Sequence, residues 1–181
     1  MKKTILLLLF ILGFSIKVNA EINRIVSGQD DAKITIIAYE SLTCSFCADF
    51  HNKIYPLLKK EFIDTGLVKI EFRHFPLDII ALNASKISQC KQDQSLEIMM
   101  SLYSDQQAWI KGKTIEEANE NLKKFVANKN FNLDFEKCIS DKKIEDFVLN
   151  DRIEGTKKFK VNSTPTTVSY THLTLPTSPH V

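Results

Sequence analysis

The sequence predicts an α/β fold in which a helical block interrupts a strand–helix–strand unit. Residues 33–39 have the composition of a buried strand, and residues 67–75 alternate as a second core strand does. Between them, residues 44–63 carry apolar side chains at helical spacing. Residues 78–160 then contain only two glycines and no proline, and the strand pattern resumes after Thr164-Pro165. These observations place a helical insertion inside an otherwise alternating fold.

The first elements follow from local signals. Ile25-Val26 is expected to form a short strand that leads through a turn into the strand 33–39. The helix 44–63 contains Pro56, which predicts a kink, and Asp64-Thr65-Gly66 ends it.

The insertion is expected to hold several helices. Thr114, with Glu117 three residues later, resembles a capping box that starts one of them. The predicted helical stretches are 79–92, 95–109, 114–128, a shorter one near 132–139, and 142–160.

The N-terminus has the features of a secretory leader. Lys2 and Lys3 precede an apolar stretch of 12 residues, 5–16, and Val18-Asn19-Ala20 ends in small residues. As a helix this stretch spans roughly 18 Å, less than the ~30 Å hydrocarbon core. We therefore expect a signal peptide cleaved after Ala20 and a Gram-negative periplasmic protein; the alternative is an uncleaved N-terminal anchor.

The composition of the remaining chain is that of an ordinary globular protein. Three of the 24 basic residues and none of the 22 acidic ones lie in the leader, so the rest carries a net charge of −1. This balance gives no indication of a nucleic-acid or membrane-surface partner. The apolar content of 44% and the 12 phenylalanines suffice for one packed core.

Two cysteines stand where the first long helix begins. Cys44 follows the strand 33–39 and precedes the helix, so free N–H groups and the helix dipole favour its thiolate. Cys47, one turn later, falls on the apolar face, where burial disfavours ionisation. The pattern predicts a dithiol/disulfide exchange site in which Cys44 attacks and Cys47 resolves. Leu42 and Phe46 flank the site as an apolar seat for unfolded substrate.

The alternative for this pair is one half of a zinc site. A zinc site needs a second close pair of ligands, but Cys90 and Cys138 lie 48 positions apart, and His51 and His74 are not paired in sequence. We therefore expect no metal, and we interpret His51 as an ordinary polar residue of the helix.

Cys90 and Cys138 fall in two different helical stretches of the insertion. An even cysteine count in an oxidising compartment favours a second bridge, which would contribute roughly 4 kcal/mol in the chain-entropy model. The alternatives are a second redox pair that tunes the first, or two free buried thiols.

Four segments resemble DsbA-like thiol:disulfide interchange proteins, in the thioredoxin-fold branch with an extra cysteine pair in its helical insert. They are Tyr39–His51, Tyr55-Pro56, Phe72–Asp78 and Asn162–Thr166. The resemblance implies a thioredoxin-like fold with an inserted helical domain. Its expected parts are residues 21–77, the insertion 78–160, and residues 161–167, which begin the second part with the cis-proline loop.

The resemblance also implies roles for particular residues. Cys44 and Cys47 match the catalytic redox pair, with Ser45 and Phe46 as the dipeptide between them. Pro165 matches the cis-proline that faces the pair; with Thr164 before it, it would bind extended substrate peptides. Cys90 and Cys138 match the extra pair, expected to be a structural disulfide.

The implied function is disulfide donation to unfolded or newly secreted cysteine-containing proteins. The protein would be a monomer without a cofactor, re-oxidised by a membrane oxidase. The alternatives are a disulfide isomerase or reductase, and a zinc-binding or purely structural periplasmic module.

The sequence departs from the family at two places. Ser45-Phe46 replaces the frequent Pro-His, which removes an imidazole beside the thiolate and predicts a weaker oxidant. Ala38 stands six residues before the first cysteine, where many relatives bury a carboxylate. Proton transfer to and from Cys47 must therefore use another route, such as water or Glu40.

The C-terminal residues 168–181 do not match the family. Residues 168–177 can be back-translated into a string that resembles the transposase mosaic end and adapter used in DNA library preparation. We expect an adapter-derived tail fused to a truncated gene, with the last strands and closing helix missing. The alternative is a natural polar C-terminus.

Overall fold

The computed structural model of the chain describes residues 21–171. The expected signal peptide, residues 1–20 with cleavage after Ala20, lies outside the described residues. So do residues 172–181, the last part of the expected adapter-derived tail.

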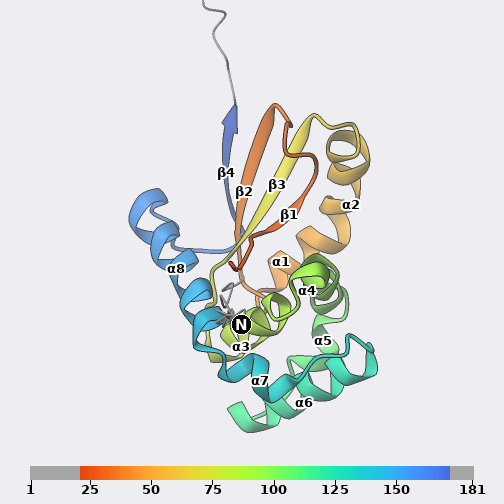
Figure 1. The fold of residues 1–181 in the computed structure, drawn as a ribbon, viewed down its shortest axis with the longest axis vertical. Helices are drawn as coiled ribbons and strands as arrows, with labels where there is room; N and C mark the ends of the chain where they lie inside the picture. Colours follow the sequence, from red (N-terminus) through yellow and green to blue (C-terminus); the bar gives the residue numbers. More distant parts are fainter. Residues whose placement is uncertain (1–20, 172–181) are drawn as a thin grey trace, which may run out of the picture.

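A four-stranded mixed sheet forms the centre of the fold. The strands stand in the order β1-β3-β2-β4 (Figure 1). The central strands β2 and β3 are parallel, and β1 and β4 pair with them in antiparallel fashion at the two edges. The strands are β1 (Ile25–Ser27), β2 (Ile34–Glu40), β3 (Val68–His74) and β4 (Thr166–Thr171). Residues 168–171, assigned from the sequence to the tail, thus form the second part of β4.

The helices cover both faces of this sheet and extend beyond one end of it. In Figure 1, α1 and α2 lie on one side, α8 on the other, and the remaining helices gather below. The α-helices are α1 (Ser45–Asp49), α2 (Tyr55–Leu58), α3 (Ile79–Gln89), α4 (Ser95–Ser104), α5 (Gln106–Trp109), α6 (Ile115–Asn128), α7 (Phe135–Ser140) and α8 (Lys142–Phe159). Two π-helical segments, Phe50–Ile54 and Lys59–Ile63, alternate with α1 and α2, and a 3₁₀ turn, Gln92–Gln94, precedes α4.

The helix from 45 to 63 accommodates Pro56 by widening. Pro56 has no N–H to give to the preceding turn. The turn before it is π-helical, and the backbone N–H of Tyr55 donates to the carbonyl of Phe50, five residues back. Where the sequence predicts a kink at Pro56, the structure shows a π-helical turn before it.

Polar caps start the helices of the insertion. The Thr114 side chain accepts a hydrogen bond from the N–H of Glu117, as the capping pattern predicts. Asp78 and Asp141 start α3 and α8 in the same way.

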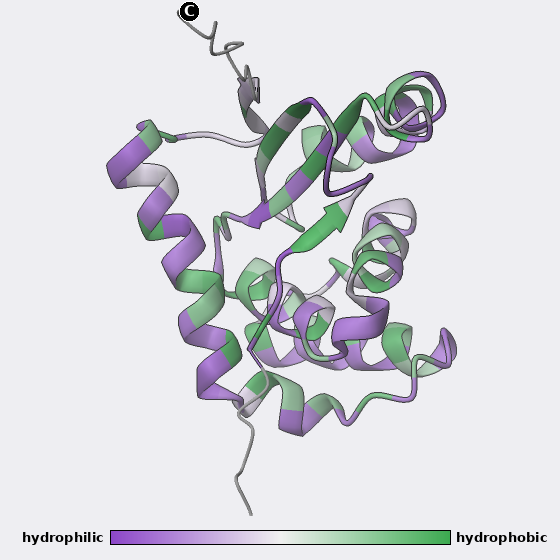
Figure 2. Cartoon of the chain, turned by 45° about the horizontal axis from the view of Figure 1, so that its top comes forward, coloured by the Kyte–Doolittle hydropathy of each residue, from purple (hydrophilic) through white to green (hydrophobic). Residues whose placement is uncertain are grey.

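The sheet separates two groups of buried side chains. Ala38 and its alternate neighbours on β2 face α1–α7, where most of the core lies. Ile37 and Tyr39 point to the opposite face and pack with Phe75 and Val161. In Figure 2, β1 is green, whereas α8, which borders solvent, is mainly purple. Because both faces of the sheet are covered, β2 carries buried apolar side chains on both of its sides.

Glycine lets α8 approach the second face closely. A Cβ atom at Gly155 would stand 2.7 Å from Cε1 of Tyr39, a side chain with no exposed surface. Residues 142–159, assigned from the sequence to the insertion, thus also cover the sheet.

A disulfide joins two helices of the insertion. Cys90, just after α3, is bonded to Cys138 in α7, with 5.5 Å between their Cα atoms. The buried Lys86 amino group also pairs with Glu145 at 2.6 Å, which ties α3 to α8.

The architecture confirms the predicted fold class, a thioredoxin-like α/β fold with inserted helices. The expected strands and helices are present, with shifts at their ends. The predicted stretch 95–109 is divided between α4 and α5. Within residues 21–171, none of the helices is both long and apolar enough to cross a bilayer.

His74, at the end of β3, is a buried neutral histidine. It is 4% exposed, and Nε2 of Gln89 lies 3.0 Å from its Nε2. Because an amide nitrogen only donates, the imidazole nitrogen accepts here. Burial lowers the pKa of His74 to about 4.

We expect acid to destabilise the fold through His74. As pH falls from 6.5 to 4, the unfolded chain binds a proton that the folded chain does not. The contribution of neutral His74 is complete above pH 6.5 and decreases by about 3 kcal/mol by pH 4. Urea unfolding of wild type and His74→Gln at pH 7 and pH 4 measures this. The stability advantage of wild type over the variant should fall by that amount.

Titration of the neighbouring Asp151 changes the stability in the opposite direction: as pH falls, the folded chain binds this proton before the unfolded chain does. Burial raises the pKa of Asp151 to about 6, although Arg24 and Arg73 oppose this. Since Asp151 is present in both proteins, it cancels in the comparison. Parallel stability curves for the two proteins would show that His74 does not contribute.

Candidate active site

Cys44 occupies the junction between β2 and α1. It is the residue before the helix, with an extended backbone at φ −78° and ψ 120°. Its N–H donates to the carbonyl of Ser41 at 3.0 Å, and its own carbonyl accepts from the N–H of Ala48 at 3.1 Å. The sulfur therefore lies at a helix N-terminus, where the dipole favours an anion.

The two thiols differ sharply in their surroundings. Cys44 is half-buried, whereas Cys47 has no exposed surface; both are unbonded. Burial raises the pKa of the Cys47 thiol strongly, and the Glu40 carboxylate adds to this. One accessible and one shielded sulfur is the arrangement that the spacing predicts.

The loop before β4 returns to this site. The Thr164–Pro165 peptide bond is cis. The Sγ of Cys44 donates to the carbonyl oxygen of Thr164 at 3.4 Å, across 120 residues of sequence. The Thr164 hydroxyl is buried without a hydrogen-bond partner. The structure thus brings together Cys44, Thr164 and Pro165. In the sequence, only the resemblance to DsbA-like proteins connects them.

A buried acid–imidazole pair lies behind the thiols. Nε2 of His51 is 2.5 Å from Oε2 of Glu40, and both side chains are almost fully buried. The His51 ring stacks on Tyr103 at 4.1 Å between centroids, and its Nδ1 lies 3.3 Å from the sulfur of Met100. The second carboxylate oxygen of Glu40 is buried without a partner.

His51 is therefore a buried, paired side chain and not the ordinary polar residue predicted from the sequence. The signal that could have revealed this is its position four residues after Cys47, because residues at i and i+4 share one helix face. A histidine on the buried face needs a buried partner, and Glu40 supplies it.

Exposed apolar side chains surround the accessible sulfur. Phe46 is 71% exposed, and Leu77 and Ile79 are 48% and 43% exposed. Residues 77–79 lie beside the site because the Thr43 hydroxyl donates to the carboxylate of Asp78 at 2.7 Å. Leu42, expected beside Phe46, is instead 2% exposed and belongs to the core.

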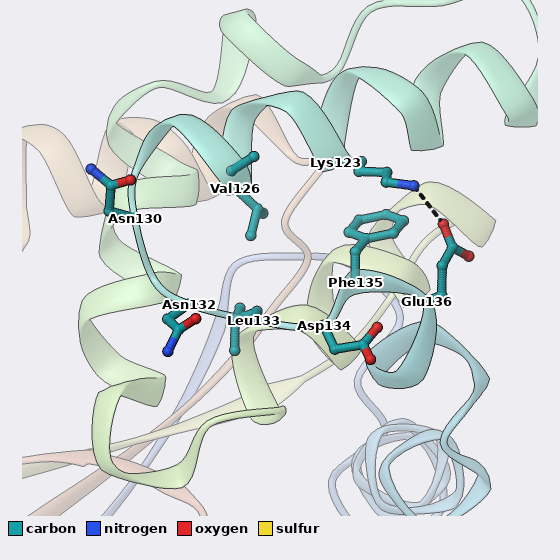
Figure 3. A pocket seen from close by; sticks show the side chains of 9 residues that line it. Lys123, Val126, Asn130, Asn132, Leu133, Asp134, Phe135 and Glu136 are labelled. Atoms are coloured by element: carbon teal, nitrogen blue, oxygen red, sulfur yellow. Dashed lines mark hydrogen bonds and ion pairs between the residues drawn. The ribbon is translucent and has the colours of Figure 1, made fainter.

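The insertion contains a separate cavity between α6 and α7. It measures about 590 Å³, and Lys123 and Glu136 form an ion pair of 3.0 Å at its edge (Figure 3). No thiol or imidazole lines it. Within the part of the chain that the structure describes, no group of three or more His, Cys, Asp or Glu residues is placed to hold a metal ion.

Comparison with known proteins gives the family. The sequence family described as Thioredoxin matches residues 20–169. The crystal structure of Wolbachia pipientis alpha-DsbA1 is 32% identical and superposes with a TM-score of 0.74, over 84% of this chain and 77% of that chain. This chain is a DsbA-like member of the thioredoxin family.

Other similar proteins extend this result. The DsbA-like chain is 28% identical over 156 residues to a Rickettsia bellii protein named as a protein-disulfide oxidoreductase. That match covers 84% of this chain but only 59% of the Rickettsia protein. The oxidised structure of BdbD from Bacillus subtilis shares the fold, with a TM-score of 0.63 and 21% identity over 81% of this chain and 80% of BdbD.

Proposed function

We propose that the protein is a periplasmic thiol-disulfide oxidoreductase that donates the Cys44–Cys47 disulfide to secreted proteins containing cysteines. One observation carries the proposal: an accessible sulfur at a helix N-terminus faces the cis-proline loop, and its partner three residues later is fully shielded. A structural bridge has no need of this asymmetry, whereas exchange requires one sulfur to react and the other to resolve.

The exchange transfers two electrons. A substrate thiolate attacks the Sγ of Cys44 in the oxidised pair, the Cys44–Cys47 bond breaks, and Cys47 leaves and takes up a proton. A second substrate thiolate then attacks the substrate sulfur of the mixed disulfide, and Cys44 leaves as a thiolate. The substrate is oxidised to a disulfide and the protein is reduced to the dithiol. A membrane re-oxidase, as partner, would restore the disulfide.

The surroundings of Cys47 favour its return to the protonated thiol. Its raised pKa means that the leaving Cys47 sulfur captures a proton, so the reverse attack is suppressed. We expect Glu40 or water to carry that proton, because Ala38 offers no carboxylate at the position that many relatives use. The unpartnered oxygen of Glu40 supports this assignment.

Substrate would contact the surface around Cys44. The exposed side chains of Phe46, Leu77 and Ile79 suit an unfolded apolar segment. The backbone at Thr164 and Pro165 suits an extended peptide, since a strand-like segment can pair with it.

The test measures disulfide exchange and its direction. The protein, produced without residues 1–20, is equilibrated with glutathione redox buffers, and then mixed in its oxidised form with a reduced, cysteine-containing peptide. We expect the peptide to be oxidised with stoichiometric appearance of the dithiol. In cells, trapping of thiols with acid should find the pair mainly oxidised.

Other outcomes identify the alternative functions. A pair that is mainly reduced in cells, with efficient reshuffling of a scrambled protein, would replace the oxidase by an isomerase or reductase. If the cysteine pair does not react with any thiol, or if it carries a stoichiometric zinc ion, exchange chemistry is contradicted altogether.

A further inference from the structure

Gln106 reaches the active-site turn from a distant part of the chain. It is the first residue of α5 and is 4% exposed. Its side-chain Nε2 donates to the carbonyl of Leu42 at 2.8 Å and to the carbonyl of Cys44 at 3.0 Å. Both N–H groups of the amide can therefore serve the turn that carries the reactive sulfur. The buried indole of Trp109 fixes α5 in place by donating to the carbonyl of Leu102 at 2.8 Å.

The turn also makes hydrogen bonds that do not involve Gln106. Cys44 bonds back to Ser41 at 3.0 Å, and the Ser41 hydroxyl accepts from the N–H of Leu77 at 3.3 Å. On the side of Gln106, a cavity of about 380 Å³ is lined by both Ser45 and Gln106. Two side chains of the insertion thus reach the turn: Asp78 accepts from the Thr43 hydroxyl, and the Gln106 amide donates to the two carbonyls.

We propose that Gln106 is a positioning residue for Cys44. The inference rests on the exchange function proposed above and adds a residue to it. Carbonyl oxygens carry partial negative charge, and the carbonyl oxygen of Cys44 belongs to the same residue as the reactive sulfur. N–H donors on these two oxygens offset that charge, and they hold the sulfur at the helix N-terminus and opposite Thr164.

The effect on the chemistry has a definite direction. Cys44 is the sulfur that leaves as a thiolate when the product disulfide forms. Support for that thiolate stabilises the dithiol form and makes the pair a better oxidant. Loss of the two donors should therefore slow reactions of the Cys44 thiolate and shift the exchange equilibrium toward the disulfide form.

The experiment compares Gln106→Glu with Gln107→Glu. The first change keeps the shape but replaces two donors by a charge that faces two carbonyl oxygens; the second adds the same charge at an exposed neighbour. At neutral pH we expect Gln106→Glu to reduce the alkylation rate of Cys44 about tenfold, and to shift the equilibrium with glutathione about tenfold toward the disulfide. Gln107→Glu should match wild type. The difference should narrow in acid, as the new carboxyl group is protonated.

A second variant shows whether the effect comes from the lost hydrogen-bond donors or from misfolding caused by the new charge. Gln106→Met removes the donors without adding charge, and should change both quantities in the same direction by a smaller factor. If both Gln106 variants melt at lower temperature but keep the wild-type alkylation rate and equilibrium, the residue is only structural and the inference is wrong. Faster alkylation in the variants, from opening of the turn, would also overturn it. Absence of exchange in wild type would instead refute the proposed function, because the alkylation comparison does not depend on exchange.

Discussion

Serine in place of Cys44 is expected to reduce catalysed disulfide exchange to the background rate of the reagents. The accessible sulfur is the atom that the substrate attacks, and no other described thiol is free and accessible, because Cys47 is fully buried and Cys90 is bonded to Cys138. A hydroxyl group neither accepts this attack nor leaves as a stable anion at neutral pH. Oxidation of a reduced peptide and reduction of insulin by dithiothreitol both measure the loss.

Serine in place of Cys47 is expected to give a different defect. Cys44 can still form a mixed disulfide, but the resolving sulfur is missing, so the complex should accumulate and be visible on a non-reducing gel. Ser140→Ala is the control, since Ser140 is exposed at the end of α7 and outside the active site, and it should keep exchange close to wild type. Equal accumulation of mixed disulfides in the Cys44 and Cys47 variants would show that the roles are assigned wrongly.

Removal of the Cys90–Cys138 bridge is expected to lower the free energy of unfolding by about 4 kcal/mol. The bridge closes a loop of 48 residues, and in the chain-entropy model its main effect is to restrict the unfolded chain. The double variant Cys90→Ser, Cys138→Ser should therefore melt on the order of 10 °C below wild type. Thermal and urea unfolding measure the change, with Cys44→Ser as the control that removes the active-site pair but keeps the Cys90–Cys138 bridge.

The same variant distinguishes a structural bridge from a second redox pair. A structural bridge predicts that the folded double variant keeps the exchange equilibrium of Cys44–Cys47 at 25 °C. A large shift of that equilibrium with little loss of stability would instead favour a redox pair that tunes the first, the alternative that the sequence leaves open.

Local patterns were sufficient to predict most of the elements. The alternation of 67–75, the helical spacing of 44–63 and the cap at Thr114 depend on neighbours in sequence, and the structure has the corresponding elements. Element ends were less accurate, as in the division of 95–109 into α4 and α5, because short-range signals there are weak.

Contacts between distant residues were not predictable in this way. Nothing in the periodicity connects Gln106 with the carbonyls of Leu42 and Cys44, or His51 with Glu40. Each contact depends on how one element packs on another. For this reason the sequence wrongly predicts His51 as an ordinary polar residue, and predicts Leu42 as part of the substrate seat although it lies in the core.

The sequence by itself determined the chemistry of this protein: two cysteines three residues apart, at the start of a helix, behind a buried strand. The apolar pattern of residues 44–63 places Cys47 on the buried face and Cys44 at the helix N-terminus, so their unequal character follows from the local sequence. Only the tertiary structure decided what surrounds the reactive sulfur. The carbonyl of Thr164, the amide of Gln106 and the Glu40–His51 pair arrive from separate elements, and packing of those elements, a long-range property, brings them together.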